Sequence, residues 1–147
     1  MVLSKACSYA ILATLYISRK NSSDYVSIKE ISKQLNISFH FLTKILQTLT
    51  EKGILESLRG PRGGVRLARN PSDLTLLDII LAIDGPELFT ECILGLPGCG
   101  VAKPCPMHEH WEKVRNDLKA RFASKTLADI SERVEEFKLR LSRGLLP

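Results

Sequence analysis

The first half of the chain shows the spacing of hydrophobic residues that α-helices require. Apolar residues recur every three or four positions over residues 4–19, where a capping serine opens a first helix. The segment Ser27–Glu30 has the sequence of a capping box and predicts a second, short helix. A tight corner follows at 36–37, and Ser38 is expected to cap a third helix that Gly53 ends. The pattern therefore predicts helix, short helix, corner, helix.

Two short strands are expected directly after the third helix. Residues 54–59 and 65–68 alternate in the manner of strands and flank a glycine-rich tip at 60–64. Thr75 then begins a fourth helix, which stops at 84–86. The order of these elements is that of a winged helix-turn-helix, with the hairpin as the wing.

The last third of the chain predicts two further helices after a cysteine-rich loop at 86–106. One begins near residue 107 and the other at Thr126, and each carries an apolar stripe. The stripes are Trp111, Val114, Leu118 and Phe122, and then Ile130, Val134, Phe137 and Leu141. A chain of 147 residues cannot bury both stripes as well as its own core, so we expect a homodimer. The expected fold is mainly α, with a DNA-binding domain at 1–85 (wing 54–68) and a dimerisation helix pair at 107–147.

Charge is distributed unevenly along the sequence. Residues 1–70 carry 11 Lys and Arg against 4 Asp and Glu, a net of +7, whereas residues 71–147 have a net of −2. A basic module beside a near-neutral one is typical of a protein that binds a polyanion. No apolar run approaches the roughly 20 residues that span a bilayer, so we expect no membrane partner and a cytoplasmic protein.

The winged helix-turn-helix and the positive charge together predict binding to double-stranded DNA. The third helix would enter the major groove, and the arginines of the wing would contact phosphates or a narrow minor groove. An outward phenylalanine could touch a thymine methyl, or could pack on the hairpin or on a partner subunit. A winged helix that is used only for contacts with other proteins remains an alternative for the whole motif. The expected DNA-binding residues are Ser38, Phe39, His40, Thr43 and Lys44, with Arg59, Pro61, Arg62 and Gly63 in the wing.

Three cysteines and a histidine lie close together in the sequence, in the order Cys92-x6-Cys99-x5-Cys105-x2-His108. Three thiolates and an imidazole are enough ligands to close a metal or iron–sulfur site. The spacing differs from the close cysteine pairs of zinc fingers, although zinc and unligated thiols remain alternatives. No nucleophile–base pair, paired carboxylates or phosphate loop is visible, so we expect neither an enzyme nor a small-molecule substrate.

The sequence resembles the Rrf2 family of winged-helix transcriptional regulators, and within it the IscR-like iron–sulfur branch. The resemblance lies above all in the wing Arg59-Gly60-Pro61-x-Gly63-Gly64 and in Cys105-x2-His108-x2-Trp111. It implies a homodimer on palindromic operators and a [2Fe-2S] cluster held by three cysteines and a histidine, here Cys92, Cys99, Cys105 and His108.

One departure from the family affects the ligand set. The gap between the first two cysteines is six residues, where the family usually has five. Some relatives take the fourth ligand from an acidic residue near the start of the first helix of the other subunit, and the matching position here is Ser8, a poor iron ligand, with Cys7 beside it. His108 is therefore ranked first as the fourth ligand, before Cys7 from the partner subunit and then His110. We expect a regulator, and specifically a repressor, whose operator binding depends on the cluster. A cluster-free regulator controlled by a thiol switch or by a protein partner is the alternative.

Overall fold

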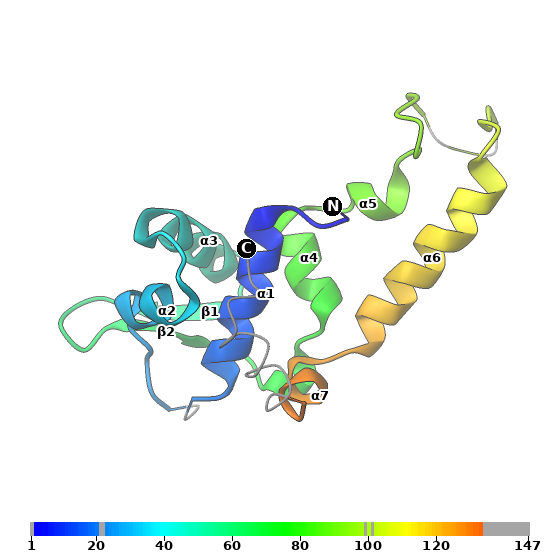
Figure 1. Cartoon of the computed structure of the whole chain (residues 1–147). Helices are drawn as coiled ribbons and strands as arrows, with labels where there is room; N and C mark the ends of the chain where they lie inside the picture. The colour runs from blue at the N-terminus through cyan, green and yellow to red at the C-terminus, as the bar shows by residue number, and fades with distance from the viewer. Residues whose placement is uncertain (1, 21–22, 99, 101, 134–147) are drawn as a thin grey trace.

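The structure is a computed structural model that describes residues 2–20, 23–98, 100 and 102–133. Within those ranges, no helix is both long enough and apolar enough to cross a membrane. Figure 1 shows a compact body formed by the first four helices and a hairpin, from which a long helical arm projects.

The elements follow the predicted order, with two short additions. The helices of the body are α1 (Lys5–Ser18), α2 (Ile28–Leu35), α3 (Phe39–Glu51) and α4 (Leu76–Ile83). The wing consists of β1 (Leu55–Leu58) and β2 (Gly64–Leu67), paired antiparallel with Leu55 opposite Leu67. A 3-10 turn η1 (Pro71–Asp73) precedes α4, and the chain continues through α5 (Glu87–Thr90), α6 (His108–Ser124) and α7 (Leu127–Ser131).

Most of the predicted helix ends are confirmed by their local hydrogen bonds. The Ser4 hydroxyl accepts from the Cys7 N–H at 3.0 Å and caps α1. Asn36 adopts the left-handed conformation (φ 52°) at the corner between α2 and α3. Full capping boxes open α4, where Thr75 and Asp78 exchange bonds, and α7, where Thr126 and Asp129 do the same. These ends depend on neighbouring residues alone, which explains why they could be predicted.

Two predicted caps are wrong in part. Ser27 accepts from the Glu30 N–H at 3.1 Å, but the Glu30 carboxylate instead accepts from the Tyr16 hydroxyl and the Lys20 ammonium, both at 2.7 Å. Ser38 occupies the N-cap position of α3 but makes no side-chain capping bond. In the first case a partner on another helix attracts the carboxylate more strongly than a neutral backbone N–H does.

The hydrophobic core lies where α1 meets α2, α3, the wing and α4. It includes the inner faces of these helices, with Leu42, Ile45, Leu46 and Leu49 of α3 all buried. Leu127 of α7 is also fully buried in this core, and the segment before it runs beside η1 and α4 through a bridge between Thr75 and Thr126. The described part of α7 therefore packs on the body. The rest of its predicted stripe, from Val134 onward, lies outside the described residues.

The arm consists of α5, the cysteine loop and α6. The helix α5 was not predicted, since four residues carry no readable period, and the described residues between 91 and 107 form neither helix nor strand. Within the single chain, the predicted stripe of α6 does not face the body at Val114, which is 53% exposed, while Arg115 is only 8% exposed. The inward face of α6 is formed by His108, Trp111, Arg115, Leu118 and Phe122, each three or four residues from the next.

Candidate DNA-binding face and cysteine loop

A groove separates α3 from the wing on the outer side of the body. Phe39, Thr43 and Gln47 line it from α3, each one turn after the last, and residues 57–61 and 63–65 line it from the wing. The start of α2, with Ser27 and Lys29, closes one end. Because α3 and the wing both border this surface, a DNA duplex laid against α3 would also meet the wing.

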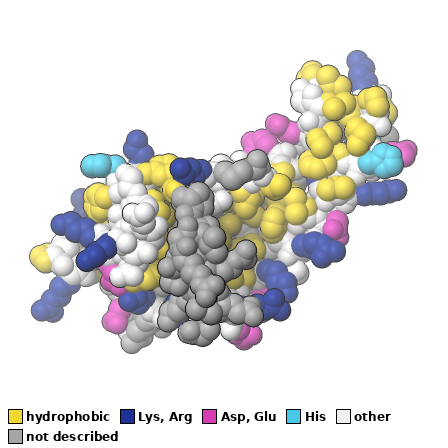
Figure 2. All heavy atoms as spheres, viewed as in Figure 1, with side chains coloured by type: hydrophobic (Ala, Val, Ile, Leu, Met, Phe, Trp, Pro, Cys, Tyr) yellow, Lys and Arg dark blue, Asp and Glu magenta, His cyan; other side chains and the backbone are white. Residues whose placement is uncertain are grey.

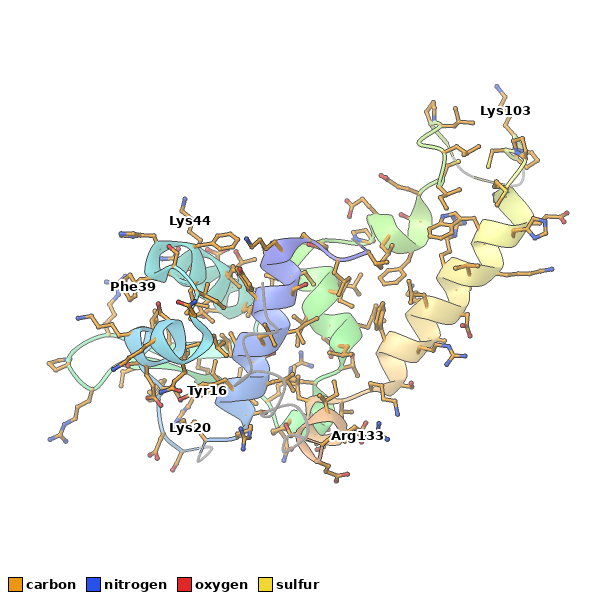
Figure 3. All side chains as sticks on the ribbon, in the orientation of Figure 1. Tyr16, Lys20, Phe39, Lys44, Lys103 and Arg133 are labelled. Atoms are coloured by element: carbon orange, nitrogen blue, oxygen red, sulfur yellow. The ribbon has the colours of Figure 1, made fainter. Side chains whose placement is uncertain are left out.

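The nine predicted DNA-binding residues lie at the start of α3, from its N-cap Ser38 onward, or at the wing tip. Five of them line the groove, namely Phe39, Thr43, Arg59, Pro61 and Gly63. Arg62 lines a separate hollow together with Tyr25 and Glu30. Seven of the nine are exposed, whereas Thr43 and Gly63 are partly covered. The Thr43 hydroxyl donates to the Phe39 carbonyl at 2.7 Å, so it is already engaged within the helix. Figure 3 shows Lys44 pointing outward from α3, while Phe39 lies on the side facing the wing. The two side chains therefore present a cation and an aromatic ring in different directions.

The wing is held to the body by backbone pairing with Val26. The Val26 N–H donates to the Val65 carbonyl at 2.8 Å, and the Val65 N–H donates back at 2.9 Å. Gly64 has φ +152°, and a Cβ there would collide with the Val26 carbonyl oxygen. The glycine at this position thus allows the closest approach of the wing to the segment before α2.

One wing arginine has a structural role and is not free to bind DNA. Arg66 forms an ion pair with Glu56 at 3.0 Å, donates to the Ser23 carbonyl and stacks over the Tyr25 ring at 4.4 Å. The exposed Arg59 and Arg62 lie beyond it at the tip. The sequence alone does not separate these three arginines, because each follows or precedes a glycine-rich turn.

Two of the three candidate cysteine ligands are adjacent in the cysteine loop. The Cys92 Sγ lies 3.4 Å from the Cys105 Sγ. Two thiolates on one tetrahedral metal at about 2.3 Å would stand about 3.8 Å apart, so the observed spacing is close to what a shared metal requires. Cys99 lies outside the described residues, and those described include no group of three or more His, Cys, Asp or Glu side chains able to hold a metal.

The candidate fourth ligand differs sharply from its neighbour in burial. His108 begins α6 and is 6% exposed, and its backbone N–H donates to the Cys105 carbonyl at 3.0 Å. Its Nε2 lies 3.9 Å from a carboxylate oxygen of Glu112, one turn further along the helix. A carboxylate beside a ring nitrogen is the usual companion of a metal-binding histidine. His110, by contrast, is exposed. Cys92, Cys105 and His108 stay the candidate donors among the described residues, although together they do not form a group able to hold a metal.

Cys7 is poorly placed to serve as a ligand. It is fully buried between α1 and α4, in an apolar cluster with Ile80 and Phe89. Burial, with a smaller effect from the Asp84 carboxylate, raises the pKa of the Cys7 thiol to about 12. A metal ligand must be a thiolate, and this environment favours the neutral thiol. The structure thus favours Cys7 as a small core residue over its alternative role as a ligand supplied by the partner.

Arg115 is a buried residue of the arm whose inward position the sequence analysis did not predict. Its guanidinium donates to the carbonyls of Thr90 and Glu91, at 3.2 and 3.3 Å. A signal was present, because Arg115 continues the three-and-four spacing of His108, Trp111, Leu118 and Phe122. An arginine in such a stripe is usually assigned to solvent, and only the position of α5 shows that it faces inward.

The comparisons with known proteins agree with this geometry over nearly the whole chain. The pattern of the Rrf2 family, described as an iron-dependent transcriptional regulator, matches residues 3–133. The chain belongs to the Rrf2 family. It is also 30% identical to an HTH-type transcriptional regulator of Aquifex aeolicus over 145 residues, covering 97% of this chain and all of that one.

Two solved structures share the fold of this Rrf2 protein. The global cysteine regulator CymR of B. subtilis superposes with a TM-score of 0.76 at 26% identity, covering 89% of this chain and 96% of CymR. IscR of T. potens superposes with a TM-score of 0.72 at 28% identity, covering 91% and 88%. The family consists of DNA-binding transcriptional regulators, so this chain is a regulator and not an enzyme. The winged-helix prediction is confirmed.

Proposed function

We propose that this Rrf2 regulator is a repressor that binds a palindromic operator as a homodimer and responds to an iron–sulfur cluster, [2Fe-2S], in its arm. Cys92, Cys99, Cys105 and His108 are its ligands. The observation that carries the proposal is the 3.4 Å separation of the Cys92 and Cys105 sulfurs. A buried histidine follows three residues after Cys105, at the start of α6. The similarity to IscR supports it.

The cluster would supply a reversible one-electron redox centre that is lost when iron or sulfide is scarce. The protein's own residues would transmit the presence or loss of the cluster from the arm to the body. Cys105 and His108 are joined to the first turn of α6, while Cys92 follows α5. Ligands on both elements hold α5 and α6 at a defined separation. A change in that separation reaches α1 and α4 through Phe89, which is buried against Cys7 and Ile80.

The DNA-binding half of the proposal rests on the face formed by α3 and the wing. We assign phosphate contacts to Lys44, Arg59 and Arg62, and base contacts in the major groove to Phe39 and His40. The dimer would place two such faces one helical turn of DNA apart. The exposed Val114 on the outer side of α6 is the apolar side chain we assign to the subunit interface.

The same two cysteines favour a second candidate, a thiol switch without a cluster. Sulfurs 3.4 Å apart can form a disulfide after a small movement. In that reaction two thiols lose two protons and two electrons, and glutathione disulfide as the oxidant is reduced to two glutathione thiols. The two candidates differ in whether iron and sulfide copurify with the protein.

Anaerobic purification of the full chain tests the proposal. We expect a coloured protein with iron and sulfide in equal amounts, and near-complete loss of both in Cys92→Ala, Cys99→Ala and Cys105→Ala. His108→Ala should lose the cluster in air, while His108→Cys should keep it at a lower reduction potential because a thiolate is more negative than an imidazole. The matched control is His110→Ala, an exposed histidine two residues away, which should behave as wild type.

The outcomes separate the two candidates. A colourless protein whose Cys92 and Cys105 link on treatment with glutathione disulfide supports the thiol switch and rejects the cluster. His108→Ala with wild-type colour and air stability excludes His108 as a ligand. Operator affinity with and without the cluster should differ by about 5–150-fold, the usual range for coupled sites.

A further inference from the structure

We propose that Trp111 and Arg115 are positioning residues that set the location of the Cys92 thiol relative to Cys105. The proposal rests on the function above but concerns side chains that the ligand set does not include. Both residues belong to the inward face of α6, and both donate to carbonyls at the end of α5. Neither is itself a ligand.

The carbonyl of Glu91 receives two donors from α6. The Trp111 Nε1–H donates to it at 2.8 Å and the Arg115 guanidinium at 3.3 Å, while the same guanidinium also reaches the Thr90 carbonyl at 3.2 Å. A carbonyl oxygen has two lone pairs, so this one is fully engaged by side chains 20 and 24 residues away in the sequence.

The position of this carbonyl decides where Cys92 lies. The Glu91 carbonyl and the Cys92 nitrogen and Cα belong to one planar peptide unit. Two donors that hold the oxygen therefore also restrict the position of the Cα of Cys92, and with it the region that its thiol can reach. On the opposite side, the Cys105 carbonyl accepts from the His108 N–H at 3.0 Å. The backbone beside each cysteine is thus hydrogen-bonded to α6, so this helix sets the positions of both cysteines relative to each other.

Burial strengthens these contacts. Arg115 is 8% exposed and Cys92 is 9% exposed, so the guanidinium and the thiol are both largely shielded from water. Hydrogen bonds from a charged donor are stronger than neutral ones, and more so in such surroundings. Simple capping of α5 would need one donor from a nearby residue, whereas here a buried cation and an indole from another helix converge on the residue directly before a cysteine.

The test compares three variants with wild type. Trp111→Phe removes one N–H and keeps the ring, Arg115→Met removes the donors and keeps the length, and Arg115→Lys keeps the charge with a single ammonium. Arg121→Met is the matched control, since Arg121 is an exposed arginine on the same helix that pairs with Asp117. Thermal unfolding of each cluster-free protein verifies that it is folded.

The first readout does not depend on the cluster. Glutathione disulfide is added to cluster-free protein, and the appearance of a Cys92–Cys105 linkage is followed by peptide mass spectrometry. We expect linkage to slow about 10-fold or more in Arg115→Met, to recover in part in Arg115→Lys, and to match wild type in Arg121→Met. Equal rates in all variants would overturn the proposal, whatever the wild type binds.

The second readout uses the cluster itself. Arg115→Met should retain iron about 10–100-fold less well against a chelator, as is typical when a group supporting a metal ligand is removed. Its cluster should also have a lower reduction potential than that of Arg115→Lys, because a buried positive charge favours the more negative reduced form. A lowered melting temperature with unchanged linkage rate, iron retention and potential would reduce Arg115 to a helix cap. If the wild-type protein contains no iron, the proposed cluster is rejected. The rate of Cys92–Cys105 linkage then tests by itself whether Trp111 and Arg115 position Cys92.

Discussion

The helices α3 and α6 show how differently the two halves of this molecule are held. The 13 residues of α3 bury four aliphatic side chains in the main core. Among the 17 residues of α6, only a histidine and an arginine are buried, with Trp111, Leu118 and Phe122 partly covered. Figure 2 shows hydrophobic side chains gathered at the surface along the arm and over its tip, where Ile93, Leu94, Leu96 and Met107 are exposed.

The comparison teaches which half can respond to a signal. Apolar burial is non-directional and places α3 without any ligand. The arm depends on directional contacts: the bonds from Trp111 and Arg115 to α5, and, as we propose, the cluster and the partner subunit. Regions with few buried apolar contacts open most easily, and binding sites are commonly drawn from them. The predictions below test this contrast, from the largest expected effect to the smallest.

Leu46→Ala should be the most damaging of these changes to the free energy of unfolding. The side chain is 1% exposed in the core, and such a truncation costs about 2–5 kcal/mol. Val114→Ala in the arm should cost less than about 0.5 kcal/mol in the cluster-free protein at low concentration, because the side chain is exposed. Urea denaturation measures both. Similar losses of unfolding free energy in the two variants would contradict the proposed difference in stability between the body and the arm.

Charges on the two sides of α6 should have different consequences. Leu118 packs toward α4 and α5, so Leu118→Glu should disorder the arm, at a cost of about 1–3 kcal/mol or more for a buried polar group without a partner. Val114→Glu should leave the protomer folded and separate the dimer. Sedimentation velocity combined with circular dichroism distinguishes the two outcomes. A Val114→Glu protein with the dimer affinity of wild type would place the interface elsewhere.

Operator binding should depend on some basic side chains of the body and not on others. Arg59→Ala and Lys44→Ala should each lower the slope of log affinity against log salt by about 0.9 if each contacts one phosphate. Arg66→Ala is the control, because Arg66 is held by Glu56 and Tyr25. Gel-shift titrations over a salt series give the slopes. A loss confined to Arg66→Ala would move the DNA contact away from α3 and the wing tip.

The smallest effect concerns Glu30, which joins α2 to α1. Its bonds with Lys20 and Tyr16 lower the pKa of this carboxyl from its ordinary value of 4.5. A lowered pKa stabilises the fold above the ordinary value, and the benefit disappears as the pH falls through the folded value. Glu30→Gln should therefore cost below about 1 kcal/mol near neutral pH, with a gap that closes on acidification. Urea melts across acidic pH measure this, with Glu109→Gln in the arm as control. A gap that stays constant would assign the loss to something other than charge.

Much of the fold was predictable because its signals are local. The caps at Ser4, Thr75 and Thr126 and the corner at Asn36 use residues within four positions of each other. The basic first half and the wing sequence led to the nine candidate DNA contacts, which the structure places at the start of α3 and at the wing tip, five of them along one groove. Their roles in binding remain predictions, as do the four cluster ligands.

The features that sequence alone could not settle all depend on residues far apart in the chain. Glu30 does not complete its capping box because Tyr16 of α1 and Lys20, two residues after the end of α1, lie within bonding distance of its carboxylate. Arg115 points toward α5 because the carbonyls of Thr90 and Glu91 accept hydrogen bonds from its guanidinium. Arg66 is unavailable for DNA because it pairs with Glu56 and stacks on Tyr25. Helical periodicity and capping depend on residues a few positions apart and can therefore be predicted from the sequence. The choice among partners for a charged side chain depends on which groups the fold brings within about 3 Å, and only the tertiary structure decides that.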